Sequence, residues 1–209
     1  MFKSGFIGII GRPNVGKSTL LNVLVGEKIA IATHKPQTTR NRISGILNTD
    51  RGQFVFVDTP GIHNAATPLN RQLVATATDT FRNADILCLV IEAGTGLHRE
   101  DISIIDSLKT FNLPVILAIN KTDLVVKSSL LPLIDGIRKK HSFSAIVPLS
   151  AINSEGVDIL VDEIWNLLPE GQPFFPDDIM TDRSERFIAA EIIRENIILL
   201  THQEIPYVT

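Results

Sequence analysis

A lysine and a serine stand side by side near the start of the chain, at the end of a short segment bounded by glycines. The segment is Gly11-Arg12-Pro13-Asn14-Val15-Gly16-Lys17-Ser18. Glycines let backbone N–H groups turn inward around a phosphate, and a helix that follows adds the positive end of its dipole. Lys17 would then neutralise the β- and γ-phosphates of a nucleotide, and the Ser18 hydroxyl would bind Mg²⁺. The spacing predicts a phosphate-binding loop; a glycine-rich turn without a ligand is the simpler alternative.

A second motif that can bind a metal follows the apolar residues 53–57. It reads Asp58-Thr59-Pro60-Gly61. Nucleotide sites of α/β proteins collect their ligands at the carboxyl ends of strands, where Asp58 would lie. Asp58 is expected to hold the Mg²⁺ shell, and the backbone N–H of Gly61 is expected to face the γ-phosphate. The motif is common when it stands alone and becomes informative because it follows a phosphate-binding loop.

A third motif indicates which base the nucleotide carries. Asn120-Lys121-Thr122-Asp123 comes directly after the apolar residues 115–119. The carboxylate of Asp123 can accept hydrogen bonds from N1–H and the exocyclic amine of guanine, which adenine cannot reciprocate. The Lys121 stem can pack along the ring, and the backbone N–H groups of Ser150 and Ala151 can reach guanine O6. The motif therefore predicts guanine.

The elements that must position these motifs alternate along the chain. Continuous apolar runs predict buried strands, and apolar positions with a 3.6-residue period predict helices between them. Such alternation is typical of a parallel sheet covered by helices on both faces. The expected strands cover 6–10, 43–47, 53–57, 86–91, 115–119 and 145–149; the expected helices begin at 19 and cover 69–82, 100–111, 130–140 and 157–168.

Composition limits the function classes that remain. The 209 residues include 44 % hydrophobic and 21 % charged residues, enough for a buried core in one α/β domain with a remainder. A net charge of −3 argues against a broad nucleic-acid surface. The single cysteine, Cys88, lies in an apolar run, so we expect a packed core thiol and no disulfide framework. No apolar run approaches the length of a membrane span.

The three motifs, in this order, resemble those of small GTPases. The amino-acid sequence around the phosphate loop is similar to that of the translation-factor-related group of GTPases. Within that group, the chain resembles the Era family of ribosome-assembly GTPases. That closer resemblance rests on residues 37–42, 58–63, 181–187 and 204–207 and covers the whole chain. It implies a P-loop GTPase fold with a mostly parallel six-stranded sheet, GTP or GDP as ligand, and Mg²⁺ as cofactor.

The resemblance also implies roles for single residues. Thr39 matches the threonine that binds Mg²⁺ and responds to the γ-phosphate, so the expected Mg²⁺ ligands are Ser18, Thr39 and Asp58. Asn14 matches an asparagine that helps to hold K⁺ near the phosphates in related GTPases. Ile62 stands where other small GTPases carry a water-orienting glutamine, a task that isoleucine cannot perform by hydrogen bonding. Lys17, Thr39 and Gly61 are expected to act in catalysis, and the expected nucleotide contacts are Gly11, Arg12, Pro13, Asn14, Val15, Gly16, Lys17, Ser18, Thr19, Asp58, Thr59, Pro60, Gly61, Asn120, Lys121, Asp123, Ser150 and Ala151.

The resemblance predicts three parts: a GTPase domain at 1–170, a linker at 171–180, and the truncated start of a KH-type RNA-binding domain at 181–209. KH recognition requires a Gly-x-x-Gly loop, and that pattern does not occur after Leu168. Asp182 followed by Glu185 predicts a helix start. The helix would carry a wide apolar stripe, so we expect 181–209 to be poorly ordered or packed against another protein surface.

The resemblance implies a slow GTP-hydrolysing switch in small-subunit assembly and 16S rRNA maturation, with small-subunit rRNA and the 30S subunit as partners. Specific RNA binding is not expected for these 209 residues. A cytoplasmic location is expected, with peripheral association at the inner face of the cell membrane as an addition. Two alternatives stay open: a P-loop kinase with a small-molecule acceptor, and a scaffold that binds nucleotide without hydrolysing it.

Overall fold

One twisted sheet organises the chain, and the computed structural model describes residues 1–32, 43–58, 84–94 and 96–200. The sheet has six strands in the order β2-β3-β1-β4-β5-β6. Only the hairpin pair β2 and β3 is antiparallel, and every other neighbouring pair is parallel. The predicted mostly parallel α/β sheet is therefore confirmed. The strands are β1 (Lys3–Ile10), β2 (Ile43–Thr49), β3 (Gly52–Asp58), β4 (Ile86–Glu92), β5 (Val115–Asn120) and β6 (Ala145–Pro148).

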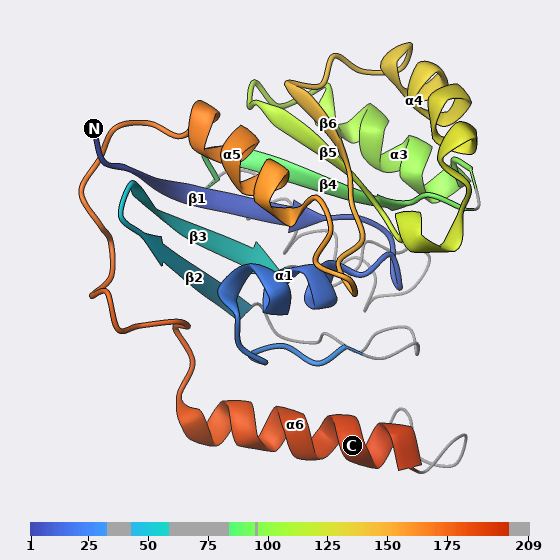
Figure 1. Ribbon diagram of the computed structural model, residues 1–209. Coiled ribbons are helices and arrows are strands. Elements are labelled where there is room, and N and C mark those ends of the chain that lie inside the picture. The colour runs from blue at the N-terminus through green and yellow to red at the C-terminus, as the bar shows by residue number, and fades with distance from the viewer. Residues whose placement is uncertain (33–42, 59–83, 95, 201–209) are drawn as a thin grey trace.

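Helices cover both faces of this sheet (Figure 1). Helices α1 (Lys17–Val25) and α5 (Val157–Leu167) share one buried cluster with β1 and β3. Helices α3 (Arg99–Leu108) and α4 (Leu130–Arg138) share the other with β4 and β5. The two faces are covered as the sequence predicted, while the expected helix at 69–82 lies outside the described residues. No helix within the described ranges is long and apolar enough to cross a bilayer.

Alternation along the central strands divides the two cores. Ile7 and Cys88 face α1 and α5, while Leu87 and Leu89 face α3 and α4. Cys88 is 1 % exposed, and burial raises the pKa of its thiol to about 12. The prediction of a core thiol is therefore confirmed.

Residues 170–182 run along the edge of the sheet instead of spanning open solvent. Phe174 and Phe175 donate their backbone N–H groups to the Gln53 side chain, at 2.6 and 2.9 Å. Further along, the N–H of Ile46 in β2 donates to the carbonyl of Met180 at 2.8 Å. Residues 170–182, here called the strap, therefore cover the β2 edge, which would otherwise present unpaired backbone groups. The predicted linker at 171–180 lies within the strap.

The last helix, α6 (Glu185–Leu200), begins two residues later than an N-cap at Asp182 would give. Ser184 stands at its start, where its Oγ accepts from the N–H of Phe187 at 3.3 Å. Asp182 does not cap the helix because its carboxylate is bonded to Ser44 in β2. Phe187 and Ile188 pack against the core cluster under α1 and α5, so this chain itself covers part of the helix.

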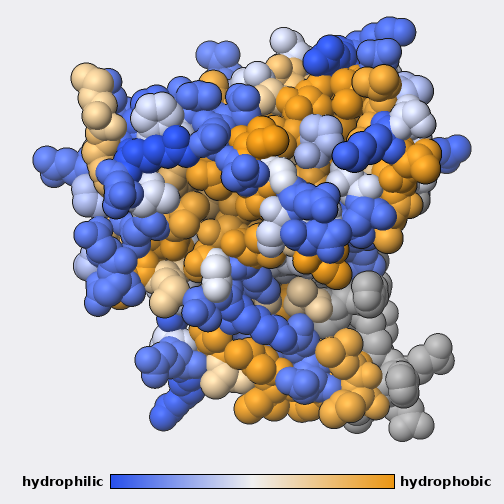
Figure 2. All heavy atoms as spheres, in the orientation of Figure 1, coloured by the Kyte–Doolittle hydropathy of each residue, from blue (hydrophilic) through white to orange (hydrophobic). Residues whose placement is uncertain are grey.

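Other apolar side chains of α6 stay exposed. Ile193 is 60 % exposed and Leu200 is 78 % exposed. Figure 2 shows apolar side chains gathered on α6, which lies below the sheet in the view of Figure 1. Residues 185–200 thus form a helix that contacts the domain, and its apolar stripe is only partly covered. The expectation that 181–209 are poorly ordered or packed against another protein surface stays a prediction, and 201–209 lie outside the described residues.

Candidate nucleotide-binding site

The phosphate loop joins the end of β1 to the start of α1, and its glycines are required by close contacts. Gly11 has φ of 150°, and a Cβ built there would lie 2.4 Å from the carbonyl oxygen of Val90. Gly16 has φ of 96°, and a Cβ there would lie 2.3 Å from Nδ2 of Asn120. A side chain at either position is excluded by backbone conformation and by space together. The loop therefore has the shape that the sequence predicted.

The amino terminus of α1 is built to receive an anion. Gly16 is the N-cap in the left-handed region, and no side chain of the described residues caps the helix there. The Nζ atom of Lys17 lies 3.1 Å from the Gly11 carbonyl oxygen and 2.9 Å from that of Arg12. The ammonium group thus lies within the curve of the loop, where helix N–H groups and a lysine can bind phosphate together.

Ser18 and Asp58 form a pair at the mouth of this loop. The Ser18 Oγ donates to Oδ2 of Asp58 at 2.8 Å. Burial raises the pKa of Asp58 to about 6, while nearby Lys17 and the Ser18 hydrogen bond act to lower it. Burial likewise lowers the pKa of Lys17 to about 8, against the favourable charge of Asp58.

The donor set of this pair fits Mg²⁺. Asp58 is fully buried, and its Oδ1 has no hydrogen-bond partner among the described residues. Leaving a buried carboxylate oxygen unsatisfied is costly. Carboxylate and hydroxyl oxygens are the ligands that a hard divalent cation prefers. The residues present therefore suit a magnesium ion bound between Ser18 and Asp58.

Asn120 joins the base motif to the phosphate loop. Its Nδ2 donates to the carbonyl of Val15 at 2.8 Å, and its Oδ1 accepts from the N–H of Ala151 at 2.9 Å. The side chain is only 2 % exposed, so its amide is fully engaged with protein. The predicted contact residue Asn120 therefore holds three loops together, a role that the motif alone does not reveal.

Ser150 positions the residue expected to select guanine. Its Oγ donates to Oδ1 of Asp123 at 2.6 Å, which orients an otherwise exposed carboxylate. The backbone N–H of Ser150 donates to Glu155 at 2.9 Å, and that of Ala151 donates to Asn120. Both N–H groups thus have protein acceptors. The expectation that they are open to guanine O6 is not met by these hydrogen bonds.

Glu92 is a site residue that motif reasoning missed. It ends β4, and its carboxylate lies 2.9 Å from a guanidinium nitrogen of Arg12 and 3.3 Å from Nζ of Lys121. Arg12 also faces the buried Asp101 at 3.5 Å. Glu92 therefore connects the phosphate loop with the base motif. The sequence could have indicated Glu92, because it is an acidic residue at the end of an apolar strand, and the strands before and after it each end in a nucleotide motif.

Not every expected residue can be placed. Thr39, Thr59, Pro60 and Gly61 lie outside the described residues, as does Ile62. Pro13 and Thr19 are half-buried within and just after the phosphate loop, and Asn14 is exposed at its tip with φ of 63°. The described members come together at the carboxyl ends of β1, β3, β5 and β6.

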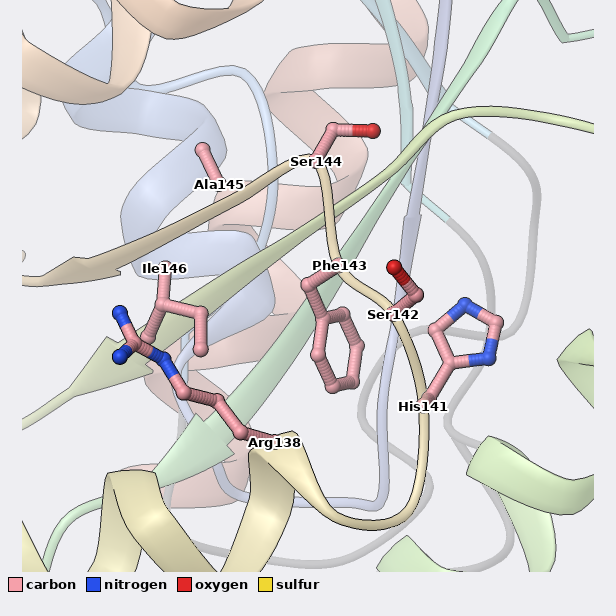
Figure 3. Close-up of a pocket in the computed structure, with 7 residues that line it drawn as sticks. All are labelled: Arg138, His141, Ser142, Phe143, Ser144, Ala145 and Ile146. Carbon is pink, nitrogen blue, oxygen red and sulfur yellow. The ribbon is translucent and has the colours of Figure 1, made fainter.

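A cavity of about 340 Å³ lies at the opposite end of the sheet, between the end of α4 and the start of β6. Figure 3 shows Phe143 in the middle of its lining, with Arg138 and His141 on either side. These residues precede β6, whereas the nucleotide motifs follow their strands. The cavity is therefore separate from the candidate nucleotide site.

Comparison with known proteins gives a consistent result. A family model described as 50S ribosome-binding GTPase matches residues 6–121. GTPase Era of Syntrophus aciditrophicus is 65 % identical over 207 residues, which are 99 % of this chain and 68 % of that protein. A crystal structure of Era with MgGDPNP and nucleotides 1506–1542 of 16S ribosomal RNA matches with a TM-score of 0.94 at 42 % identity, over 99 % of this chain and 70 % of that one. A tyrosine-to-alanine variant of Aquifex aeolicus Era bound to GDP·AlF₄⁻ matches with a TM-score of 0.92 at 43 % identity, over 98 % of this chain and 70 % of that one.

Sheet order, phosphate loop and base motif together define a P-loop GTPase. The relatives identify the family within this class, because the similarity to them covers the nucleotide motifs as well as the strap and α6. The chain belongs to the Era family of GTPases.

Proposed function

We propose that this chain binds GTP with Mg²⁺, hydrolyses it to GDP and phosphate, and thereby works as a switch in assembly of the small ribosomal subunit. The observation that carries the proposal is the Ser18–Asp58 pair beside Lys17, inside a loop that Asn120 ties to the base motif. A site of this kind holds the triphosphate and the base at once, which suits a guanine nucleotide.

Different residues bind the phosphates and the base of the nucleotide. Lys17 and the first N–H groups of α1 hold the β- and γ-phosphates, while Asp123, oriented by Ser150, accepts hydrogen bonds from the guanine edge. Glu92 keeps the Lys121 ammonium in place, so that the stem of Lys121 can lie along the base. The contacts to the β-phosphate and to the base exist for GDP as well as for GTP.

Hydrolysis breaks the bond between the γ-phosphorus and the bridging oxygen as water attacks in line. Ser18 and Asp58 would hold Mg²⁺, which spreads the charge that develops on the phosphate oxygens. Lys17 adds a fixed positive charge at the same oxygens. Thr39 and Gly61 are proposed to respond to the presence of the γ-phosphate. Because Ile62 cannot orient the water by hydrogen bonding, a slow intrinsic rate follows.

The partner is inferred from the family. Era has been crystallised with a segment of 16S ribosomal RNA. We propose that residues 1–170 act as the GTPase domain, that 171–180 connect, and that 181–209 begin a KH-type RNA-binding unit, with cytoplasmic action on small-subunit RNA and peripheral contact with the inner membrane face. Residues 1–209 alone are not expected to bind that RNA specifically, since no Gly-x-x-Gly pattern follows Leu168.

Single-turnover hydrolysis of GTP by the purified chain, with and without Mg²⁺, tests the proposal. We expect phosphate release that requires Mg²⁺, and competition by GDP but not by ATP. The Lys17→Ala variant should lose binding of both nucleotides, whereas Asp58→Ala should lose mainly the Mg²⁺-dependent part. Release of phosphate only with an added acceptor would indicate a kinase, and nucleotide binding without any release would indicate a scaffold.

A further inference from the structure

The side chain of Arg12 leaves the phosphate loop and ends between two carboxylates from other elements. Its Nη2 donates to Oε2 of Glu92 at 2.9 Å, and its Nε faces Oδ2 of Asp101 at 3.5 Å. Glu92 ends β4, and Asp101 lies in the first turn of α3. The Arg12 side chain is only 11 % exposed. The guanidinium therefore ties the phosphate loop to a strand and a helix that carry none of the three motifs.

Asp101 is more than a helix cap. Its Oδ2 accepts from the backbone N–H of His98 at 3.0 Å, which is one bond of a capping box. A neutral amide oxygen can accept the same bond, yet the residue is a carboxylate that is 1 % exposed. Burial raises its pKa, while the His98 hydrogen bond and the charge of Arg12 act to lower it. A buried carboxylate needs a cation or several donors to offset its desolvation, and Arg12 supplies the cation.

Helix α3 is a rigid support for this carboxylate. Ile104, Ile105 and Leu108 follow Asp101 on the same face of the helix, at the helical spacing of three, four and seven residues. Each is at most 3 % exposed, within the cluster shared with β4 and β5. A side chain on the first turn of a helix packed in this way has little freedom to move. The core of the sheet therefore sets the position of the Arg12 guanidinium.

The main chain of Arg12 contacts the phosphate-binding lysine. Its carbonyl oxygen accepts from Nζ of Lys17 at 2.9 Å, and that of Gly11 accepts at 3.1 Å. Lys17 is itself only 6 % exposed. Because the carboxylates hold the far end of Arg12 and its carbonyl holds the ammonium, a single residue connects Asp101 with Lys17.

We infer that Asp101 is a positioning residue for binding of the β-phosphate, because it fixes Arg12 and, through the Arg12 carbonyl, the ammonium of Lys17. The inference rests on the proposed binding of nucleotide phosphates by Lys17. Asp101 therefore contributes to affinity only for nucleotides that carry a β-phosphate. Glu92 shares the guanidinium, but it also pairs with Lys121 of the base motif. Asp101 is therefore the position at which the phosphate effect can be measured alone.

Affinities of the whole chain for GDP and GMP, measured with Mg²⁺ by competition against a fluorescent nucleotide, test the inference. Asp101→Asn keeps an oxygen for the His98 N–H and removes the charge. We expect GDP affinity to fall about fivefold or more, within the range of coupling between residues in contact, while GMP affinity stays within about twofold. Arg12→Lys keeps the positive charge but cannot reach both carboxylates, so it should show the same selective loss. Asp106→Asn, an exposed change on the same helix, is the matched control.

Combining the two substitutions separates positioning from a general loss of packing. The double variant should lose no more GDP affinity than Arg12→Lys alone, because both changes break the same connection. Additive losses would overturn the inference, as would equal losses for GDP and GMP. A wild type that binds GMP as tightly as GDP would also overturn it, since no β-phosphate is then held. If the wild type binds GDP but releases no phosphate from GTP, the proposed hydrolysis fails instead, and the ratio of GDP to GMP affinity still decides the role of Asp101.

Discussion

The Nδ2 atom of Asn120 lies 2.8 Å from the carbonyl oxygen of Val15, so the base motif and the phosphate loop share a buried hydrogen bond. In Asn120→Ala, this carbonyl and the N–H of Ala151 lose their partner inside the protein. Each unsatisfied buried group costs about 1–3 kcal/mol. We expect affinity for GDP and GTP to fall together by at least about tenfold, and the chain to melt at a lower temperature. Calorimetric titration and thermal melting measure both effects.

Asn112→Ala is the control for that change, because Asn112 is exposed in the turn before β5. It should leave both affinities unchanged. A loss confined to GTP in Asn120→Ala would contradict the bridging role, since the bridge serves contacts that GDP also makes.

Gly16→Ala is expected to abolish nucleotide binding. A Cβ there would lie 2.3 Å from Nδ2 of Asn120, and φ of 96° is unfavourable for alanine. Gly136→Ala provides the matched control, because nothing lies within 4 Å of a Cβ at that position in α4. Alanine at 136 should stabilise the chain by about 0.5–1 kcal/mol, as expected for a helix interior. Fluorescent-nucleotide titration and denaturant unfolding report the two results, and wild-type affinity in Gly16→Ala would refute this reading of the loop.

The sequence predicts the sheet well because its signals are local. The apolar run at 86–91 predicts a buried strand by itself, and the glycines at 11 and 16 indicate a backbone conformation that other residues do not readily adopt. Glu92 and Asp182 were missed or misjudged because their partners are distant in sequence: Glu92 pairs with Arg12 and Lys121, and Asp182 with Ser44. A motif names the residue types at a site, but it does not show which of them bind ligand and which, like Asn120, bind other loops.

Asp123→Asn is expected to exchange a preference for guanine for one for xanthine. The amide offers a donor to the 2-oxo group of xanthine, while it no longer accepts both guanine hydrogens. Competition of GTP and XTP for the site measures the exchange. Ser150→Ala should weaken GTP several-fold without favouring XTP, because it removes only the 2.6 Å hydrogen bond that orients the carboxylate. Unchanged GTP affinity in Asp123→Asn would rule out Asp123 as the selector.

Cys88 is expected to be unreactive in the folded chain. Burial raises the pKa of its thiol to about 12, so the thiolate that reacts with disulfide reagents is scarce at pH 8. Below pH 9.0 the thiol is protonated in both states; above it the unfolded chain releases the proton first, so the free energy of unfolding falls as pH rises toward 12. Ellman titration should find no thiol in the native chain and one in denaturant. Rapid reaction without denaturant would contradict the burial.

Potassium is expected to speed hydrolysis relative to sodium. Asn14 lies at the exposed tip of the phosphate loop, where a bound cation could add positive charge next to the developing phosphate charge. The need for such charge follows from Ile62, which supplies no hydrogen bond to water. Single-turnover rates in equal concentrations of the two salts measure the effect, and Asn14→Ala should remove the difference while it leaves the rate in sodium nearly unchanged. Equal wild-type rates in potassium and sodium would exclude the cation, and hydrolysis would then depend on Lys17 and the magnesium ligands alone.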